Sequence, residues 1–148
     1  MFTGIIEELG TVVAPAPRLR VAAKTVLEDL TEGASIAKDI NIPHAELIIR
    51  KGYHNDVDSY SAFLEADKET RTGLAGYLKE RKIDTVFVTG LATDFCVAWT
   101  ALDARNAGFN VYVVDDACRG IDINGSVAKA WEDMTKVGVK KIESSDIA

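Results

Sequence analysis

Residues 45–148 alternate short apolar runs with segments whose apolar side chains recur every three or four positions, and this alternation constrains the fold more than any other feature. The apolar runs lie at 47–49, 86–88, 111–114 and 139–142. The periodic segments between them predict three helices, the last two of which end at Gly108 and Gly138. Strands that alternate with helices form a parallel sheet with helices on its faces, because the crossover connections are right-handed. We therefore predict an α/β fold with a parallel sheet and three layers.

Composition and charge exclude several classes of partner. The 148 residues include 23 acidic and 17 basic side chains, which gives a net charge of -6. That charge argues against nucleic acid and anionic membranes as partners, and no apolar run approaches the ~20 residues that span a bilayer. The N-terminus lacks the basic region of a signal peptide, and two cysteines are too few for a disulfide scaffold. We expect a cytoplasmic protein.

Residues 1–37 differ in character from the rest of the chain. An apolar run from Ile5 to Val13 is interrupted by glycine, and Pro15 and Pro17 follow it. This pattern indicates short β-strands. We place a boundary near Lys38, with residues 1–37 as a β segment that is not an independent domain and residues 38–148 as the α/β portion.

The strongest signal for chemistry is the segment 88–96, Val-Thr-Gly-Leu-Ala-Thr-Asp-Phe-Cys. A buried strand is predicted to end at Gly90, and a helix to begin near Thr93 or Asp94, which are both good N-cap residues. Cys96 then lies in the first helical turn, where backbone N–H groups and the helix dipole favour a thiolate and could hold an oxyanion. This placement suits a nucleophile. A small buried structural cysteine is the alternative, which the pattern leaves open.

Two further segments could face the crevice beyond the carboxyl ends of the predicted strands, where open α/β sheets bind ligands. Lys51 follows the first strand, and it either stabilises negative charge in the crevice or is a solvated strand-end lysine. The loop 58–63, Asp-Ser-Tyr-Ser-Ala-Phe, could line the crevice with aromatic surface, or it is only a loop with residues typical of a helix start.

The histidines and the second cysteine give weaker signals. His44 and His54 are the only histidines. Asp56 and Asp58 near His54 would make only a loose set of metal ligands, so we interpret both histidines as surface residues. We interpret Cys118, which follows a pair of aspartates, as a packing residue.

These segments together resemble the C-terminal half of bacterial nicotinamidases (pyrazinamidases), in the isochorismatase-like cysteine hydrolases. The resemblance covers residues 38–148 and rests on five segments in order. They are Arg-Lys-Gly at 50–52, Asp-Ser-Tyr-Ser-Ala-Phe at 58–63, Gly-Leu-Ala-Thr-Asp-Phe-Cys-Val at 90–97, Thr-Ala-Leu-Asp-Ala at 100–104 and Asp-Ala-Cys-Arg-Gly at 116–120. The resemblance implies hydrolysis of a small-molecule amide, nicotinamide, to nicotinate and ammonia.

The resemblance also implies a role for particular residues. Cys96 matches the nucleophile and Lys51 the lysine of the catalytic triad. The bond between Leu91 and Ala92 matches a cis peptide at an oxyanion hole whose donors are the N–H groups of Ala92 and Cys96. Three residues match pocket-lining positions: Tyr60, Leu91 and Phe95.

Residues 1–37 instead resemble the start of riboflavin synthase, where such residues begin the first of two β-barrels. The matching segments are Met-Phe-Thr-Gly-Ile-Ile-Glu-Glu-Leu-Gly at 1–10, Leu-Arg-Val at 19–21, Val-Leu-Glu-Asp-Leu at 26–30 and Gly-Ala-Ser-Ile-Ala at 33–37. The chain is therefore interpreted as a chimera joined near Lys38 or Asp39, in which a β segment is grafted onto an isochorismatase-like half-domain.

A nicotinamidase triad also needs an aspartate base, which the resemblance places in a strand of the type apolar-apolar-Val-Asp-x-Gln. No such segment occurs before residue 45, and Glu7 or Glu8 is only a weak substitute. The family's metal ligands belong to the same missing part. We therefore predict no metal site and no other cofactor, and an inactive or strongly impaired amidohydrolase.

Two other functions remain as alternatives. The chain could be a non-enzymatic folded chimera or, less well supported, a lumazine- or flavin-binding fragment, although a partial barrel cannot enclose a ligand. The strands that the half-domain lacks would leave bare sheet edges. We therefore expect residues 1–37 to cover part of the gap, and a homo-oligomer in which segments could be exchanged.

Overall fold

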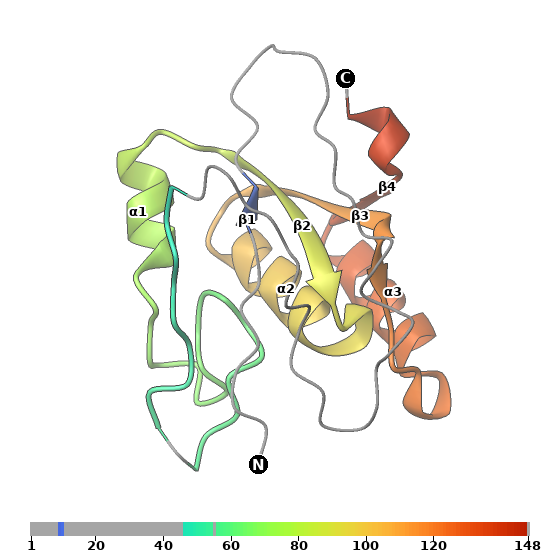
Figure 1. Cartoon of the computed structure of the whole chain (residues 1–148), viewed down its shortest axis with the longest axis horizontal. Coiled ribbons are helices and arrows are strands. Elements are labelled where there is room, and N and C mark those ends of the chain that lie inside the picture. The colour runs from blue at the N-terminus through green and yellow to red at the C-terminus, as the bar shows by residue number, and fades with distance from the viewer. Residues whose placement is uncertain (1–8, 11–45, 55, 148) are drawn as a thin grey trace.

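The computed structural model describes residues 9–10, 46–54 and 56–147, which form an α/β fold around one sheet (Figure 1). The strands are Leu9–Gly10 (β1), Thr85–Leu91 (β2), Asn110–Arg119 (β3) and Lys140–Ile142 (β4), in the order β1-β2-β3-β4. β2, β3 and β4 are parallel, and β1 pairs antiparallel with β2. The predicted α/β fold with a parallel sheet is confirmed.

The helices are Leu74–Glu80 (α1), Ala98–Asn106 (α2) and Ser126–Lys136 (α3), as the periodicity predicts. Three short turns accompany them: Thr93–Val97 (η1), Ile123–Gly125 (η2) and Ser144–Asp146 (η3). α2 packs on β2 and β3, and α3 packs against α2 and η1 (Figure 1). Gly108 and Gly138 follow α2 and α3 with φ angles of 95° and 85°, the left-handed conformation in which glycine ends a helix.

The core lies between the sheet and its helices. Val88 of β2 and Val113 of β3 are 1% and 0% exposed, and Met134 of α3 is 0% exposed. α2 presents Ala101 and Ala104, which are also fully buried, so its backbone can approach the sheet closely. This core fixes β2 and α2, which carry the candidate site at their junction.

The predicted strand at 47–49 is wrong. Residues 46–51 are in no strand, and Leu47 and Ile48 are 41% and 68% exposed. A strand needs a partner for its backbone groups, and no strand of the described residues pairs with 47–49. β2 pairs with β3 along one edge and with β1, at Phe87 and Val88, along the other. An apolar run indicates that a segment can form a strand. It does not indicate whether the sheet has an unpaired edge with which that segment can form hydrogen bonds.

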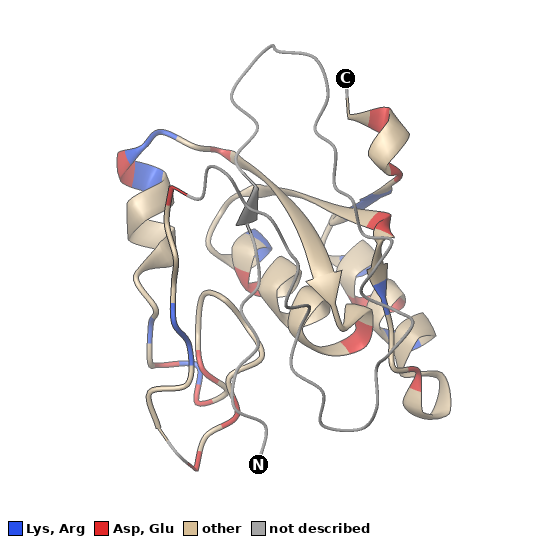
Figure 2. Ribbon diagram, viewed as in Figure 1, with Lys and Arg blue, Asp and Glu red and all other residues tan. Residues whose placement is uncertain are grey.

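Residues 1–8 and 11–45 lie outside the described part of the chain, and so do the predictions that concern His44, Glu7, Glu8 and the grafted β segment apart from the β1 pairing. Over the described residues, acidic and basic residues are interspersed along the ribbon (Figure 2). Within that same part, no helix is long and apolar enough to cross a membrane.

Candidate active site

Cys96 lies just beyond the carboxyl end of β2, in the π-helical turn η1 that continues into α2. The peptide bond between Leu91 and Ala92 is cis, as the resemblance implies. The carbonyl oxygen of Ala92 accepts hydrogen bonds from the N–H groups of Phe95 (3.0 Å) and Val97 (3.1 Å), which close the turn around the cysteine. Cys96 is partly exposed. It therefore lies where the sequence places it, in the first turn after a strand.

Asp94 does not cap this turn, contrary to the prediction. The helical turn does begin at Thr93, but its N-cap is Ala92, without a side-chain cap. Asp94 is 7% exposed, and its carboxylate accepts three hydrogen bonds, from the N–H groups of Ile121 (3.0 Å) and Asp122 (2.9 Å) and from the hydroxyl of Ser126 (2.5 Å). Burial raises the pKa of Asp94, but these donors outweigh it and hold the pKa below its ordinary value of 3.8. Asp94 thus fixes the cysteine turn to the start of α3.

Tyr60 connects the other predicted site residues. Its carbonyl oxygen accepts a 2.5 Å hydrogen bond from Lys51 Nζ. Its ring lies 5.7 Å from the ring of Phe95 and 5.6 Å from that of Trp99. Burial, the negative charge of Asp58 together with the hydrogen bond that the Tyr60 hydroxyl donates to it, and the charge of Cys96 raise the pKa of Tyr60 above 10.0. The structure therefore gathers the predicted lysine, pocket aromatics and cysteine turn around one tyrosine.

The loop that carries Tyr60 is held against α2. The N–H of Ala62 donates a 3.0 Å hydrogen bond to the hydroxyl of Thr100, and Ala62 and Phe63 are both in the core. The hydroxyl of Thr72 donates a 2.7 Å hydrogen bond to the carbonyl of Ala62. The predicted crevice loop is thus packed against α2 and the core. Cys118 is 3% exposed and packs in the same core, as predicted.

Glu65 is a site-proximal residue that the sequence analysis missed. Its side chain is fully buried, and its Oε2 lies 2.6 Å from Nδ1 of His54. Its Oε1 accepts a hydrogen bond from the N–H of Tyr53. His54 has a half-exposed side chain, as predicted for a surface histidine. Its partner is Glu65 and not Asp56 or Asp58, the acidic residues that the sequence places near it. No local spacing signals this pair, because it joins two separate loops.

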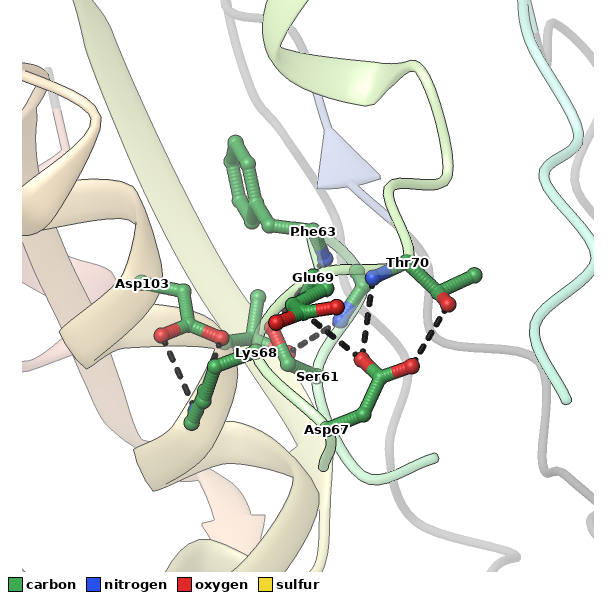
Figure 3. Close-up of polar contacts among 9 residues, drawn as sticks. Ser61, Phe63, Asp67, Lys68, Glu69, Thr70 and Asp103 are labelled. Atoms are coloured by element: carbon green, nitrogen blue, oxygen red, sulfur yellow. Dashed lines mark hydrogen bonds and ion pairs between the residues drawn. The ribbon is translucent and has the colours of Figure 1, made fainter. Parts of the chain in front are cut away.

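These residues also raise the question of a metal site. One ligand atom each from His54, Glu65 and Asp67 lies within 4.8 Å of the others. The 2.6 Å between the His54 and Glu65 atoms is a hydrogen-bond distance, shorter than two ligands at ~2.0–2.1 Å from a tetrahedral zinc would allow. Both oxygens of Asp67 accept hydrogen bonds, from the N–H groups of Glu69 and Thr70 and from the Thr70 hydroxyl (Figure 3). In the structure, each of these three side chains is thus hydrogen-bonded to a neighbouring group of the chain.

Comparison with known proteins identifies the family. The model of the isochorismatase domain matches residues 15–146. The nicotinamidase of Acinetobacter baylyi is 59% identical over 117 residues, which are 79% of this chain and 55% of that protein. The structure of an Acinetobacter baumanii nicotinamidase/pyrazinamidase aligns with a TM-score of 0.75 and 61% identity over 80% of this chain and 57% of that one. The Pyrococcus horikoshii pyrazinamidase, solved in complex with zinc, aligns with a TM-score of 0.60 and 33% identity over 71% of this chain and 55% of that one.

The extent of these matches bears on the predicted boundary. The chain spans about half the length of the relatives that it matches. The family match begins at residue 15 and therefore includes residues 15–37, which the resemblance to riboflavin synthase assigns elsewhere. The riboflavin synthase resemblance and the junction near Lys38 gain no support here. The chain belongs to the isochorismatase family.

Proposed function

We propose that this chain carries the nucleophile-bearing half of a nicotinamidase-type amidohydrolase, with Cys96 as nucleophile and nicotinamide as substrate. The proposal extends to this chain what the names of its Acinetobacter relatives say of them. The observation that carries it is the position of Tyr60, whose carbonyl oxygen is 2.5 Å from Lys51 Nζ and whose ring packs on Phe95, the residue before Cys96.

The proposed chemistry uses one thiol and one water. The Cys96 thiolate attacks the carboxamide carbon, a C–S bond forms, and the carbonyl π electrons move to oxygen. The N–H groups of Ala92 and Cys96 would stabilise that oxyanion. The C–N bond then breaks, the proton released by the thiol goes to the leaving nitrogen, and ammonia departs. Water hydrolyses the thioester to nicotinate and regenerates the thiol.

The aromatic side chains and Lys51 have separate roles in this scheme. Tyr60 and Phe95 offer ring surface on which a pyridine ring can stack, and Leu91 at the end of β2 lines the same edge of the sheet. The ammonium group of Lys51 would stabilise the thiolate and the charge that develops in the transition state.

Proton transfer is the step for which the sequence offers only a weak candidate base, Glu7 or Glu8. A general base must lie within ~3 Å of the proton that it accepts, and a positioned base contributes about 10²–10⁴-fold to the rate. The segment that would carry an aspartate base in such an enzyme does not occur before residue 45. We therefore propose that these 148 residues alone release ammonia slowly.

The test is ammonia release from nicotinamide by the purified chain and its Cys96→Ala variant, with Cys118→Ala as the matched control. We expect slow turnover that Cys96→Ala abolishes and that a folded Cys118→Ala retains. Turnover that survives in Cys96→Ala would contradict the assignment of the nucleophile.

Alkylation gives a second readout that does not depend on turnover. Iodoacetamide should modify the partly exposed Cys96 before Cys118, which is 3% exposed, and nicotinate should slow the modification of Cys96. Equal rates at the two cysteines, with no effect of nicotinate, would contradict a binding site beside Cys96.

A further inference from the structure

Glu65 is a buried carboxylate whose two oxygens both hold the segment that follows Lys51. Its side chain is fully buried, Oε1 accepts from the N–H of Tyr53, and Oε2 lies 2.6 Å from Nδ1 of His54. A buried charge is costly unless it is paired and hydrogen-bonded. Glu65 therefore has a strong preference for the one conformation of residues 51–54 that supplies both partners.

We call the contacts of Glu65 with Tyr53 and His54 the Glu65 link. The backbone around Glu65, on one side of this link, is held by hydrogen bonds of its own. The N–H of Glu65 donates a 3.0 Å hydrogen bond to the carbonyl of Thr70, and the N–H of Ala66 donates a 2.9 Å bond to the carbonyl of Asp58. Leu64, next to Glu65, forms an isolated β-bridge with Arg71. Glu65 thus sits on a closed turn that also fixes the start of the loop carrying Tyr60.

Gly52 lies between Lys51 and the two partners of Glu65, Tyr53 and His54. Its φ of +87° is in the left-handed region. Glycine adopts this conformation without steric cost and imposes little restraint of its own. The direction of Lys51 therefore depends on what holds Tyr53 and His54. With them in place, Lys51 Nζ reaches the carbonyl oxygen of Tyr60 at 2.5 Å.

We propose that Glu65, through Tyr53 and His54, is a positioning residue that holds Lys51 at the candidate active site. The assignment of Lys51 to catalysis rests on the proposed function. The effect of Glu65 on the location of the Lys51 amine does not, and it can be measured by itself.

The contact between His54 and Glu65 depends on pH, because the groups around these two side chains shift their pKa values. The hydrogen bond and charge of Glu65, and more weakly the charges of Asp67 and Asp56, raise the pKa of His54 above 6.5 against the opposing effect of burial. Burial raises the pKa of Glu65, but the hydrogen bonds from His54 and Tyr53 outweigh it and lower the pKa below 4.5.

The sign of each shift sets the window. The contribution of Glu65 is present above pH 4.5 and is lost as the pH falls through its lowered pKa. The contribution of His54 is present below pH 6.5 and is lost as the pH rises through its raised pKa. Both groups are charged between these values, so the link is complete there and loosens above the raised pKa of His54.

The experiment measures the rate at which acetic anhydride acetylates Lys51, relative to the exposed Lys82. The folded chain is acetylated first and then digested, and mass spectrometry of the peptides gives the extent of modification at each lysine. The variants are Glu65→Gln, which keeps the size of the buried group, and His54→Gln, which changes only the half-exposed partner. Glu69→Gln, an exposed carboxylate four residues from Glu65, is the control. We expect the Lys51/Lys82 ratio to rise several-fold in both variants and to stay unchanged in Glu69→Gln.

In the unsubstituted chain the same ratio should increase as the pH rises through the raised pKa of His54, and in His54→Gln it should not. A ratio that is unchanged in both variants, while their melting temperatures show them folded, would overturn the proposal. If Glu65→Gln does not fold, the acetylation ratio of His54→Gln decides the proposal by itself.

Ammonia release from nicotinamide separates this proposal from the proposed function. If the chain is active, Glu65→Gln should lower kcat/KM by about 10–100-fold, because small displacements of a charged group are expensive in catalysis. No activity in any preparation, with the expected change in acetylation, would count against the amidohydrolase while supporting the role of Glu65. Activity that is unaffected by Glu65→Gln, with acetylation of Lys51 increased, would overturn the catalytic part.

Discussion

The hydroxyl of Ser126 donates a 2.5 Å hydrogen bond to the buried carboxylate of Asp94, and so joins the first residue of α3 to the turn that carries Cys96. The N–H groups of Ile121 and Asp122 donate to the same carboxylate. One side chain therefore connects the end of β2, the segment after β3 and the start of α3. The geometry around the cysteine depends on contacts that come from about 30 residues further along the chain.

Replacement of Asp94 by asparagine should destabilise the protein. The asparagine amide has only one oxygen, so its NH₂ group would face one or more of the three donors that now bond to the carboxylate. Leaving a buried donor without an acceptor costs about 1–3 kcal/mol. Urea denaturation of Asp94→Asn should show this loss in the free energy of unfolding. The exposed Asp84→Asn should show almost none, and equal effects of the two substitutions would mean that the three hydrogen bonds do not stabilise the fold.

The same variant should reveal a pH dependence. Because the pKa of Asp94 is below 3.8 in the folded chain, its contribution is present above pH 3.8 and is lost as the pH falls through the lowered value. The difference in unfolding free energy between the unsubstituted chain and Asp94→Asn should therefore be constant at neutral pH and shrink below pH 3.8. A difference that grows on acidification would show that the sign of the shift is wrong.

What the sequence could predict follows from how local each signal is. The strands β2 to β4, the three helices and the placement of Cys96 after a strand rest on apolar periodicity within short windows, and these predictions are confirmed. The pairs His54–Glu65 and Asp94–Ser126 join residues 11 and 32 positions apart, and their formation depends on how the loops fold. The wrong strand at 47–49 has the same origin, because strand pairing depends on which sheet edge is open.

Met134 of α3 should be among the most sensitive core positions. Its side chain is 0% exposed and lies in the cluster formed with β2, β3 and α2. Truncating a buried methionine to alanine costs about 2–5 kcal/mol, because transfer energy is lost and a cavity remains. Thermal and urea unfolding of Met134→Ala should show a loss of this size, while Val137→Ala, at a position that is 40% exposed, should show a much smaller one. Similar losses would indicate that α3 does not pack against α2 and the core cluster as described.

Gly120, at the end of β3, should tolerate no side chain without movement of α3. A Cβ built at this position lies 2.1 Å from Cγ2 of Val127 and 3.4 Å from Oδ1 of Asp94. A valine in a helix has one strongly preferred rotamer, so it cannot easily turn away. Gly120→Ala should therefore destabilise the fold by about 1–3 kcal/mol, as overpacking does.

A double-mutant cycle separates this steric effect from a general effect of alanine at position 120. Val127→Ala removes the methyl group that the new Cβ would meet, so the double variant should recover most of the stability that Gly120→Ala loses. The measurement is the free energy of unfolding of all four proteins in urea. Strict additivity would mean that the two side chains do not meet, and that the start of α3 lies further from the end of β3 than the hydrogen bonds to Asp94 require.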